Sequence, residues 1–128
     1  MKLLLDTHLL LWAAGEPEKL SDKARTLIID GSNDLYFSSA SIWEIVIKKR
    51  LGRVDFRVDP GRLRKMLVVN GYIEVCIEAD HALAVDALPQ LHKDPFDRML
   101  LAQARNEGLQ LVTVDSQIIS YGDGVIDV

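Results

Sequence analysis

The chain has 128 residues and a formal net charge of −4; 48% of the residues are hydrophobic and 27% are charged, which excludes a disordered chain and bulk attraction to nucleic-acid phosphates. This length suits one domain with its own core and excludes two ordinary ones, so we expect a single domain over residues 1–128. The single cysteine, Cys76, excludes a disulfide framework and a cysteine-based zinc site, and it indicates a reducing, cytoplasmic setting with a buried structural thiol.

The first stretch of the chain predicts a strand followed by a helix. Residues 2–5, KLLL, form a short apolar run that is typical of a buried parallel strand. An apolar helix is expected to follow through Trp12 and to end near Gly15. Asp6 and His8 interrupt the apolar run, so this N-terminus is unlike a secretion signal. No stretch approaches the roughly 18 uninterrupted apolar residues of a membrane span.

The next segments continue the alternation of helices and strands. Ser21 is expected to cap a helix that Gly31 ends, and residues 35–38, LYFS, predict a second strand. The segment SASIWEIVIKKRLG predicts a helix with basic residues in its last turn and a glycine after it. Its Ser41-x-x-Glu44 spacing is that of a capping box, which predicts Ser41 as the N-cap and Glu44 in the first turn.

The second half of the chain begins with a helix, a strand and a further helix. Asp59 and Pro60 predict the start of a helix that Gly71 ends. Residues 72–77, YIEVCI, predict a third strand, and EADHALAVDAL predicts a helix that Pro89 stops.

The segment LHKDPFDRMLLAQARNEG predicts the last long helix. Asp94 is expected as its N-cap, Pro95 as its first residue and Gly108 as the residue that ends it. Residues 109–114, LQLVTV, predict a fourth strand, and the C-terminal GVIDV predicts a fifth. The alternation predicts an α/β fold, in which a parallel sheet of about five strands carries helices on both faces.

Four carboxylates are expected at one edge of this sheet. Asp6 follows the first strand and Asp115 the fourth, while Glu44 and Asp97 lie in first turns of helices that start at the same edge. Carboxylates that meet cannot all stay ionised without a countercharge, and oxygen ligands favour Mg²⁺ or Mn²⁺ over zinc. Water attack on a phosphodiester is the chemistry that such a site supports.

Each acid also has an ordinary interpretation as a helix cap or a turn residue, so a regulatory module that binds without catalysis stays open. A receiver-like signalling domain would need paired acids after the first strand, whereas LLLDTH has one, and YIEVCI ends in Ile77 instead of an acid. A phosphatase of the haloacid-dehalogenase type would need a second acid where His8 stands.

The segments LLLDTHLLLWAA, SSASIWEI, HKDPFDRMLLAQA and LVTVD resemble the successive motifs of PIN-domain ribonucleases, in particular VapC-type toxins of bacterial toxin–antitoxin pairs. The resemblance covers essentially the whole chain and implies a PIN-like fold. It implies that an acidic quartet holds Mg²⁺ and the attacking water, namely Asp6, Glu44, Asp97 and Asp115. It further implies an endoribonuclease acting on structured RNA such as tRNA, a homodimer, and inhibition by a small antitoxin whose tail occupies the site.

Several neighbours of these acids carry further expectations. Three hydroxyl residues are expected to orient the acids: Thr7, Ser38 and Thr113. His8 and His92 are expected to be hydrogen-bonded structural residues, and Arg98 to contact a phosphate or pair with an acid.

The aromatic and basic residues leave two questions open. Trp12 and Trp43 are expected in the core or at a subunit interface. Two basic runs, KKRLGR and RLRK, are explained equally well by helix-end charge on a solvated face and by contact with RNA phosphates.

Overall fold

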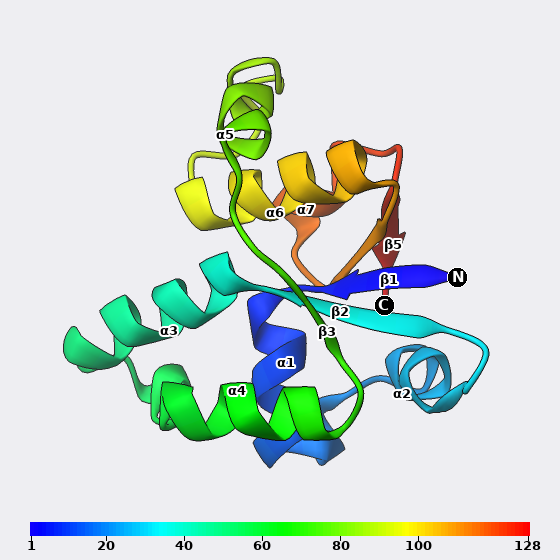
Figure 1. Ribbon diagram of the computed structural model, residues 1–128, viewed down its shortest axis with the longest axis vertical. Helices are drawn as coiled ribbons and strands as arrows, with labels where there is room; N and C mark the ends of the chain where they lie inside the picture. The colour runs from blue at the N-terminus through cyan, green and yellow to red at the C-terminus, as the bar shows by residue number, and fades with distance from the viewer.

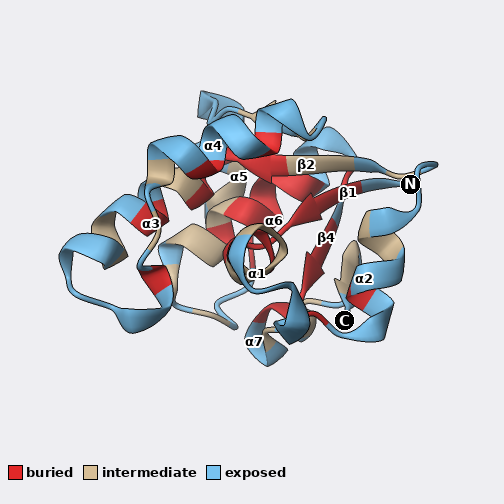
Figure 2. Ribbon diagram, turned by 90° about the horizontal axis from the view of Figure 1, so that it is seen from below, coloured by how far each residue is buried: buried red, intermediate tan, exposed pale blue.

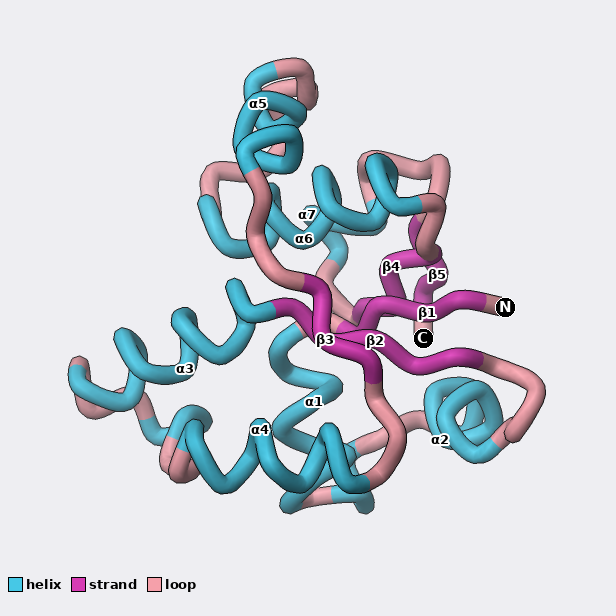
Figure 3. The backbone as a smooth tube through the Cα atoms, viewed as in Figure 1, coloured by secondary structure: helices cyan, strands magenta, loops and turns pink.

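The computed structural model describes all residues from 1 to 128, and a parallel sheet runs through its middle (Figures 1 and 3). The strands are β1 (Lys2–Leu5), β2 (Asp34–Ser38), β3 (Ile73–Val75), β4 (Gln110–Thr113) and β5 (Val125–Asp127). Their order across the sheet is β3-β2-β1-β4-β5, and every neighbouring pair is parallel. All five expected strands are confirmed, and their ends agree with the expected ones to within two residues.

Seven helices surround the sheet. They are α1 (Thr7–Gly15), α2 (Asp22–Ile29), α3 (Ser39–Arg50), α4 (Pro60–Val69), α5 (Ala79–Asp86), α6 (Pro95–Glu107) and α7 (Ser116–Ile119), with short 3₁₀ turns at Pro17–Lys19 and Val54–Phe56. The sequence did not predict α7 or the 3₁₀ turns, because elements this short show no periodicity. None of the helices combines the length and the apolar character that crossing a membrane requires.

The hydrophobic core has two halves, one on each face of the sheet. Successive strand residues point to opposite faces, so Leu3 and Leu5 pack with α1, α2 and α4, while Leu4 packs with α5, α6 and α7. Helix α3 contributes to both halves, through Ile45 on one side and Ala40 on the other. Figure 2 shows the central strands buried and the outer faces of the helices exposed.

The helix ends follow the expected capping pattern. Ser21, Asp59 and Asp94 each accept hydrogen bonds from backbone N–H groups at the start of their helices. Gly108 ends α6 with a φ of 70°, a left-handed conformation that suits glycine. The prediction for Cys76 was wrong: the thiol is exposed, because β3 is an edge strand that ends at Val75.

The topology fixes where a site can form. From β1 the chain first adds β2 and β3 on one side of the sheet, and then β4 and β5 on the other. The order therefore reverses beside β1, at the carboxyl ends of β1 and β4, where Leu5 and Thr113 end the strands. This is the place in an open parallel sheet where ligands bind.

Candidate active site

Asp6 follows β1 directly and begins α1 as its N-cap. One carboxylate oxygen accepts a hydrogen bond from the backbone N–H of Leu9 at 2.9 Å, and the other accepts from the hydroxyl of Thr113 at the end of β4. The side chain is buried, with Asp6 only 4% exposed. Burial raises the pKa of Asp6, and the hydrogen bonds from Thr113 and Leu9 offset this only in part.

Glu44 is a buried acid on α3, and its position corrects the expected capping box. The N-cap of α3 is Ser38, whose hydroxyl accepts from the backbone N–H of Ala40, so Glu44 lies in the second turn. Ser41 lies inside the helix, and its Oγ is 2.9 Å from Thr7 Oγ1. The Thr7 hydroxyl donates to Glu44 Oε1 at 2.6 Å. Glu44 therefore serves no cap and is held toward the start of α1.

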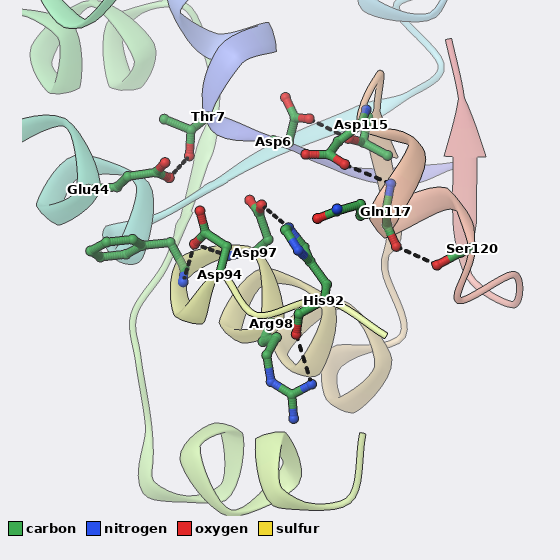
Figure 4. A network of polar contacts seen from close by, with 12 residues as sticks. Asp6, Thr7, Glu44, His92, Asp94, Asp97, Arg98, Asp115, Gln117 and Ser120 are labelled. Atoms are coloured by element: carbon green, nitrogen blue, oxygen red, sulfur yellow. Dashed lines mark hydrogen bonds and ion pairs between the residues drawn. The ribbon is translucent and has the colours of Figure 1, made fainter. Parts of the chain in front are cut away.

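Asp97 lies in the first turn of α6, where Asp94 is the N-cap. Asp94 accepts from the backbone N–H groups of Phe96 and Asp97 at 2.8 and 3.3 Å, which leaves the Asp97 side chain free of that task. Asp97 Oδ2 lies instead 2.6 Å from His92 Nε2 (Figure 4). Burial, and next the charge of Asp94, raise the pKa of Asp97 to about 7. His92 is hydrogen-bonded, as expected, and its structural role stays a prediction.

Asp115 comes two residues after β4 and begins the short helix α7. Its carboxylate accepts from the backbone N–H of Gln117 at 2.8 Å, and its own N–H donates to Thr113 Oγ1 at 3.0 Å (Figure 4). Thr113 therefore ties Asp115 and Asp6 to the same strand end. The two threonine predictions are confirmed, whereas Ser38 was wrong: its hydroxyl donates to Gln103 and contacts no acid.

The four acids line one pocket of 390 Å³. The other residues of its wall are Thr7, His8, Trp12, Lys48, Arg53, Asp94 and Val114. A larger cavity of 590 Å³ lies between α2 and α4, but nine of its 12 lining residues are hydrophobic, so it offers few groups for chemistry. Sequence positions from 6 to 115 thus meet at the reversal point of the sheet, as the strand pattern predicted.

The donor set of this pocket fits a hard divalent cation. Its acids offer carboxylate oxygens, which Mg²⁺ and Mn²⁺ prefer. In this region, His92, Asp94 and Asp97 bring their donor atoms within 4.8 Å of one another. The four expected acids do not form such a group, so their carboxylates are spread more widely over the pocket. Burial is the main cause that raises the pKa of both Asp6 and Asp97, and a bound cation would favour their ionised forms.

Lys48 and Arg53 contribute positive charge to the wall of the pocket. The sequence identifies them only as members of the basic run KKRLGR and does not predict this position. The Lys48 ammonium forms an ion pair with Glu44 and lies 3.7 Å from Asp94 Oδ2. The signal for this contact is the four-residue spacing of Glu44 and Lys48 on a helix. By contrast, Arg64 of the second run pairs with Glu74 at 2.8 Å, away from the pocket.

The remaining predictions near the site have mixed outcomes. His8 contacts Asp55 at 3.0 Å, and Trp12 lies beside its ring in the pocket wall. Trp43 is 58% exposed and outside the core. Arg98 is buried and hydrogen-bonds to backbone carbonyls and the hydroxyl of Tyr121, so its expected pairing with an acid was wrong.

Comparison with known proteins gives consistent matches over nearly the whole chain. The family model of the PIN domain matches residues 3–124. Ribonuclease VapC22 from Mycobacterium tuberculosis is 28% identical over 120 residues, which cover 93% of this chain and 91% of that protein.

Solved structures share the fold. A chain of a toxin–antitoxin complex from Klebsiella pneumoniae is 21% identical, with a TM-score of 0.65 over 97% of this chain and 95% of that chain. A chain of VapBC2 from Rickettsia felis, bound to a DNA fragment from the promoter, is 13% identical, with a TM-score of 0.70 over 100% and 98%.

Proposed function

The chain belongs to the PIN domain family, and on that premise we propose that it is a metal-dependent endoribonuclease of the VapC toxin type. The observation that carries the proposal is the meeting of four carboxylates, from four separate segments, in one pocket beside β1 and β4. The ribonuclease from Mycobacterium tuberculosis, similar over nearly its whole length, supports the same chemistry.

In this proposal the metal ligands are Asp6, Glu44, Asp97 and Asp115, which would hold Mg²⁺ or Mn²⁺. When bound, such a cation supplies activation of water and stabilisation of charge at the phosphate. The chain itself supplies orientation: Thr113 holds Asp6, Thr7 holds Glu44, and His92 holds Asp97. Arg53, on the wall of the same pocket, supplies positive charge for a phosphate of the RNA backbone.

Partners follow from the similar complexes and belong to the proposal. Toxin–antitoxin complexes among the similar structures support an antitoxin partner, and we propose that a small antitoxin inhibits this chain by placing its tail in the pocket. We propose a structured RNA such as tRNA as the substrate and a homodimer as the active form. The net charge of −4 fits recognition through local basic groups, together with the bound cation, better than bulk attraction to RNA.

A non-catalytic module remains the second candidate, because three acids of the site region do cap helices. Asp6, Asp94 and Asp115 each accept backbone N–H groups. Glu44 and Asp97 argue against it, since both are withdrawn from solvent and neither caps a helix. The strand order β3-β2-β1-β4-β5 also differs from the 2-1-3-4-5 order of receiver domains.

The test is cleavage of labelled RNA by purified protein with Mg²⁺, with EDTA, and with Asp97→Asn. We expect cleavage with Mg²⁺, none with EDTA, and a loss of at least about 100-fold in Asp97→Asn, because metal stabilisation of transition-state charge contributes several kcal/mol. Asp123→Asn, an exposed acid outside the pocket, is the control and should cleave normally. Cleavage that survives the chelator, or full activity in Asp97→Asn, contradicts the proposal.

A further inference from the structure

Lys48 is set apart from its neighbours by the direction of its side chain. It lies one helical turn after Glu44 on α3, and its side chain is 16% exposed, whereas Lys49 and Arg50 face solvent. Its ammonium contacts Glu44 Oε2 and lies 3.7 Å from Asp94 Oδ2, so it joins α3 to the start of α6. A lysine of the solvated helix end thus reaches into the acidic pocket.

Two aromatic rings fix the ammonium in that place. The nitrogen lies 5.1 Å from the ring centre of Phe56 and 5.9 Å from that of Phe96, distances at which the ring quadrupole attracts a cation. Phe56 comes from the 3₁₀ turn after α3, and Phe96 from the first turn of α6. Contacts from three elements make Lys48 a built part of the pocket.

Both oxygens of the Glu44 carboxylate already accept a hydrogen bond in this arrangement. Oε1 accepts from Thr7, and Oε2 accepts from Lys48. An ammonium has donors only and cannot share a cation's place. A divalent cation that binds Glu44 must therefore displace Lys48 or share the carboxylate with it against charge repulsion.

We propose that Lys48 is a tethered counter-cation, which neutralises Glu44 in the metal-free protein and competes with the divalent cation for that carboxylate. A lysine ammonium is charged at neutral pH, and here it faces the carboxylates of Glu44 and Asp94. The inference rests on the proposed metal site and adds a residue that sets its affinity. In this role Lys48 lowers the affinity of the pocket for the cation and stabilises the metal-free protein by neutralising Glu44.

Metal binding tests the competition directly. Isothermal titration of Mn²⁺ into EDTA-treated and dialysed protein compares the wild type with Lys48→Met, Lys48→Arg and Lys49→Met. Lys48→Met keeps a long side chain against the two rings, and it should bind Mn²⁺ at least about fivefold more tightly because one repelling charge is gone. Lys48→Arg retains the charge and Lys49→Met leaves the pocket untouched, so both should bind like the wild type. Unchanged or weaker binding in Lys48→Met overturns the competition.

Thermal unfolding in EDTA tests the counter-cation without metal or RNA. Lys48→Met should lower the melting temperature, and this loss should largely disappear when Glu44→Gln is also present, because the charge to be neutralised is then absent. Equal losses in both backgrounds overturn the role of Lys48. If neither the wild type nor Lys48→Met binds Mn²⁺, the metal site fails and the competition with it. If the wild type binds Mn²⁺ and Lys48→Met binds it with the same affinity, the metal site stands and only the competition by Lys48 is refuted.

Discussion

At the residue scale, the site holds buried carboxylates close to other negative charges, an unfavourable arrangement that a bound metal ion would relieve. Asp6 is almost fully buried, and Asp97 lies among Asp94, Glu44 and His92. Each carboxylate is hydrogen-bonded, but the bonds do not compensate for burial and like charge, since both pKa values stay raised. Strongly shifted pKa values of this kind are typical of functional sites, where charged groups are kept although they lower stability.

The metal-free protein should lose stability as the pH rises. A raised pKa means that the folded state holds the proton more tightly than the unfolded chain does. The contribution of Asp97 is therefore complete below its unfolded value of 3.8 and is lost as the pH rises through about 7. In EDTA, the free energy of unfolding should fall from pH 4 to pH 8 by on the order of a few kcal/mol.

Urea unfolding at pH 4 and pH 8 measures this dependence, and the variant Asp97→Asn tests how much of it comes from Asp97. The asparagine cannot ionise, so the variant should lose the part of the fall that Asp97 causes and keep the part that comes from Asp6, whose pKa is also raised, while Asp123→Asn should follow the wild type. An equally steep fall in Asp97→Asn would assign the effect to other groups.

At the element scale, Arg98 fastens the segment between α5 and α6. Its guanidinium donates to the carbonyls of Val85 and Pro89, both at 3.0 Å, and lies 3.2 Å from the hydroxyl of Tyr121. A further contact, at 3.4 Å, reaches the carbonyl of His92, the residue that holds Asp97 (Figure 4). Arg98 thus positions the loop that orients an acid of the site and contributes no group to the pocket wall.

Arg98→Met should destabilise the protein by about 2–4 kcal/mol, because the hydrogen bonds of the charged guanidinium to the carbonyls of Val85 and Pro89 are lost. The shift of the urea midpoint measures the loss. Arg105→Met on the same helix is the matched control: its carbonyl contacts are longer, at 3.3 and 3.4 Å, and exposed, so its loss should stay below about 1 kcal/mol. Equal losses in the two variants would refute a special role for Arg98.

The helices and strands could be predicted closely from the sequence, whereas the directions of the side chains could not. The punctuation by Asp94, Pro95 and Gly108 predicted α6 because caps act locally. Helix α3 began three residues earlier than the capping-box spacing suggested, because Ser38 at the end of β2 took the N-cap. The contacts of Lys48 with Asp94 and of Arg98 with Tyr121 join segments far apart in the chain, and no local pattern encodes them.

At the scale of the whole molecule, the site is a product of the topology. The acids converge because β1 and β4 lie side by side in parallel, so Asp6 and Asp115 leave the sheet at the same edge. That part of the site was predictable, since parallel strands bring their carboxyl ends together. The expected Mg²⁺ ligand set has still to be tested by binding.

Mg²⁺ should raise the melting temperature of the folded protein, since a ligand that binds only the folded state stabilises it by mass action. At 100 times the dissociation constant, the gain is about 2.7 kcal/mol. Asp6→Asn keeps an oxygen for the Leu9 N–H but removes a charged ligand, so most of the gain should disappear. Differential scanning calorimetry with and without Mg²⁺ measures it. A gain that persists in Asp6→Asn would place the cation elsewhere.

The wide separation of Asp6 and Asp115 along the chain has a consequence for synthesis. Strand β4 pairs with β1 only after residues 110–113 have left the ribosome, and Asp115 follows two residues later. A nascent polypeptide therefore carries Asp6, then Glu44 and later Asp97 without a complete pocket. If all four acids are needed to hold the cation, RNA cleavage can begin only after β4 has joined the sheet.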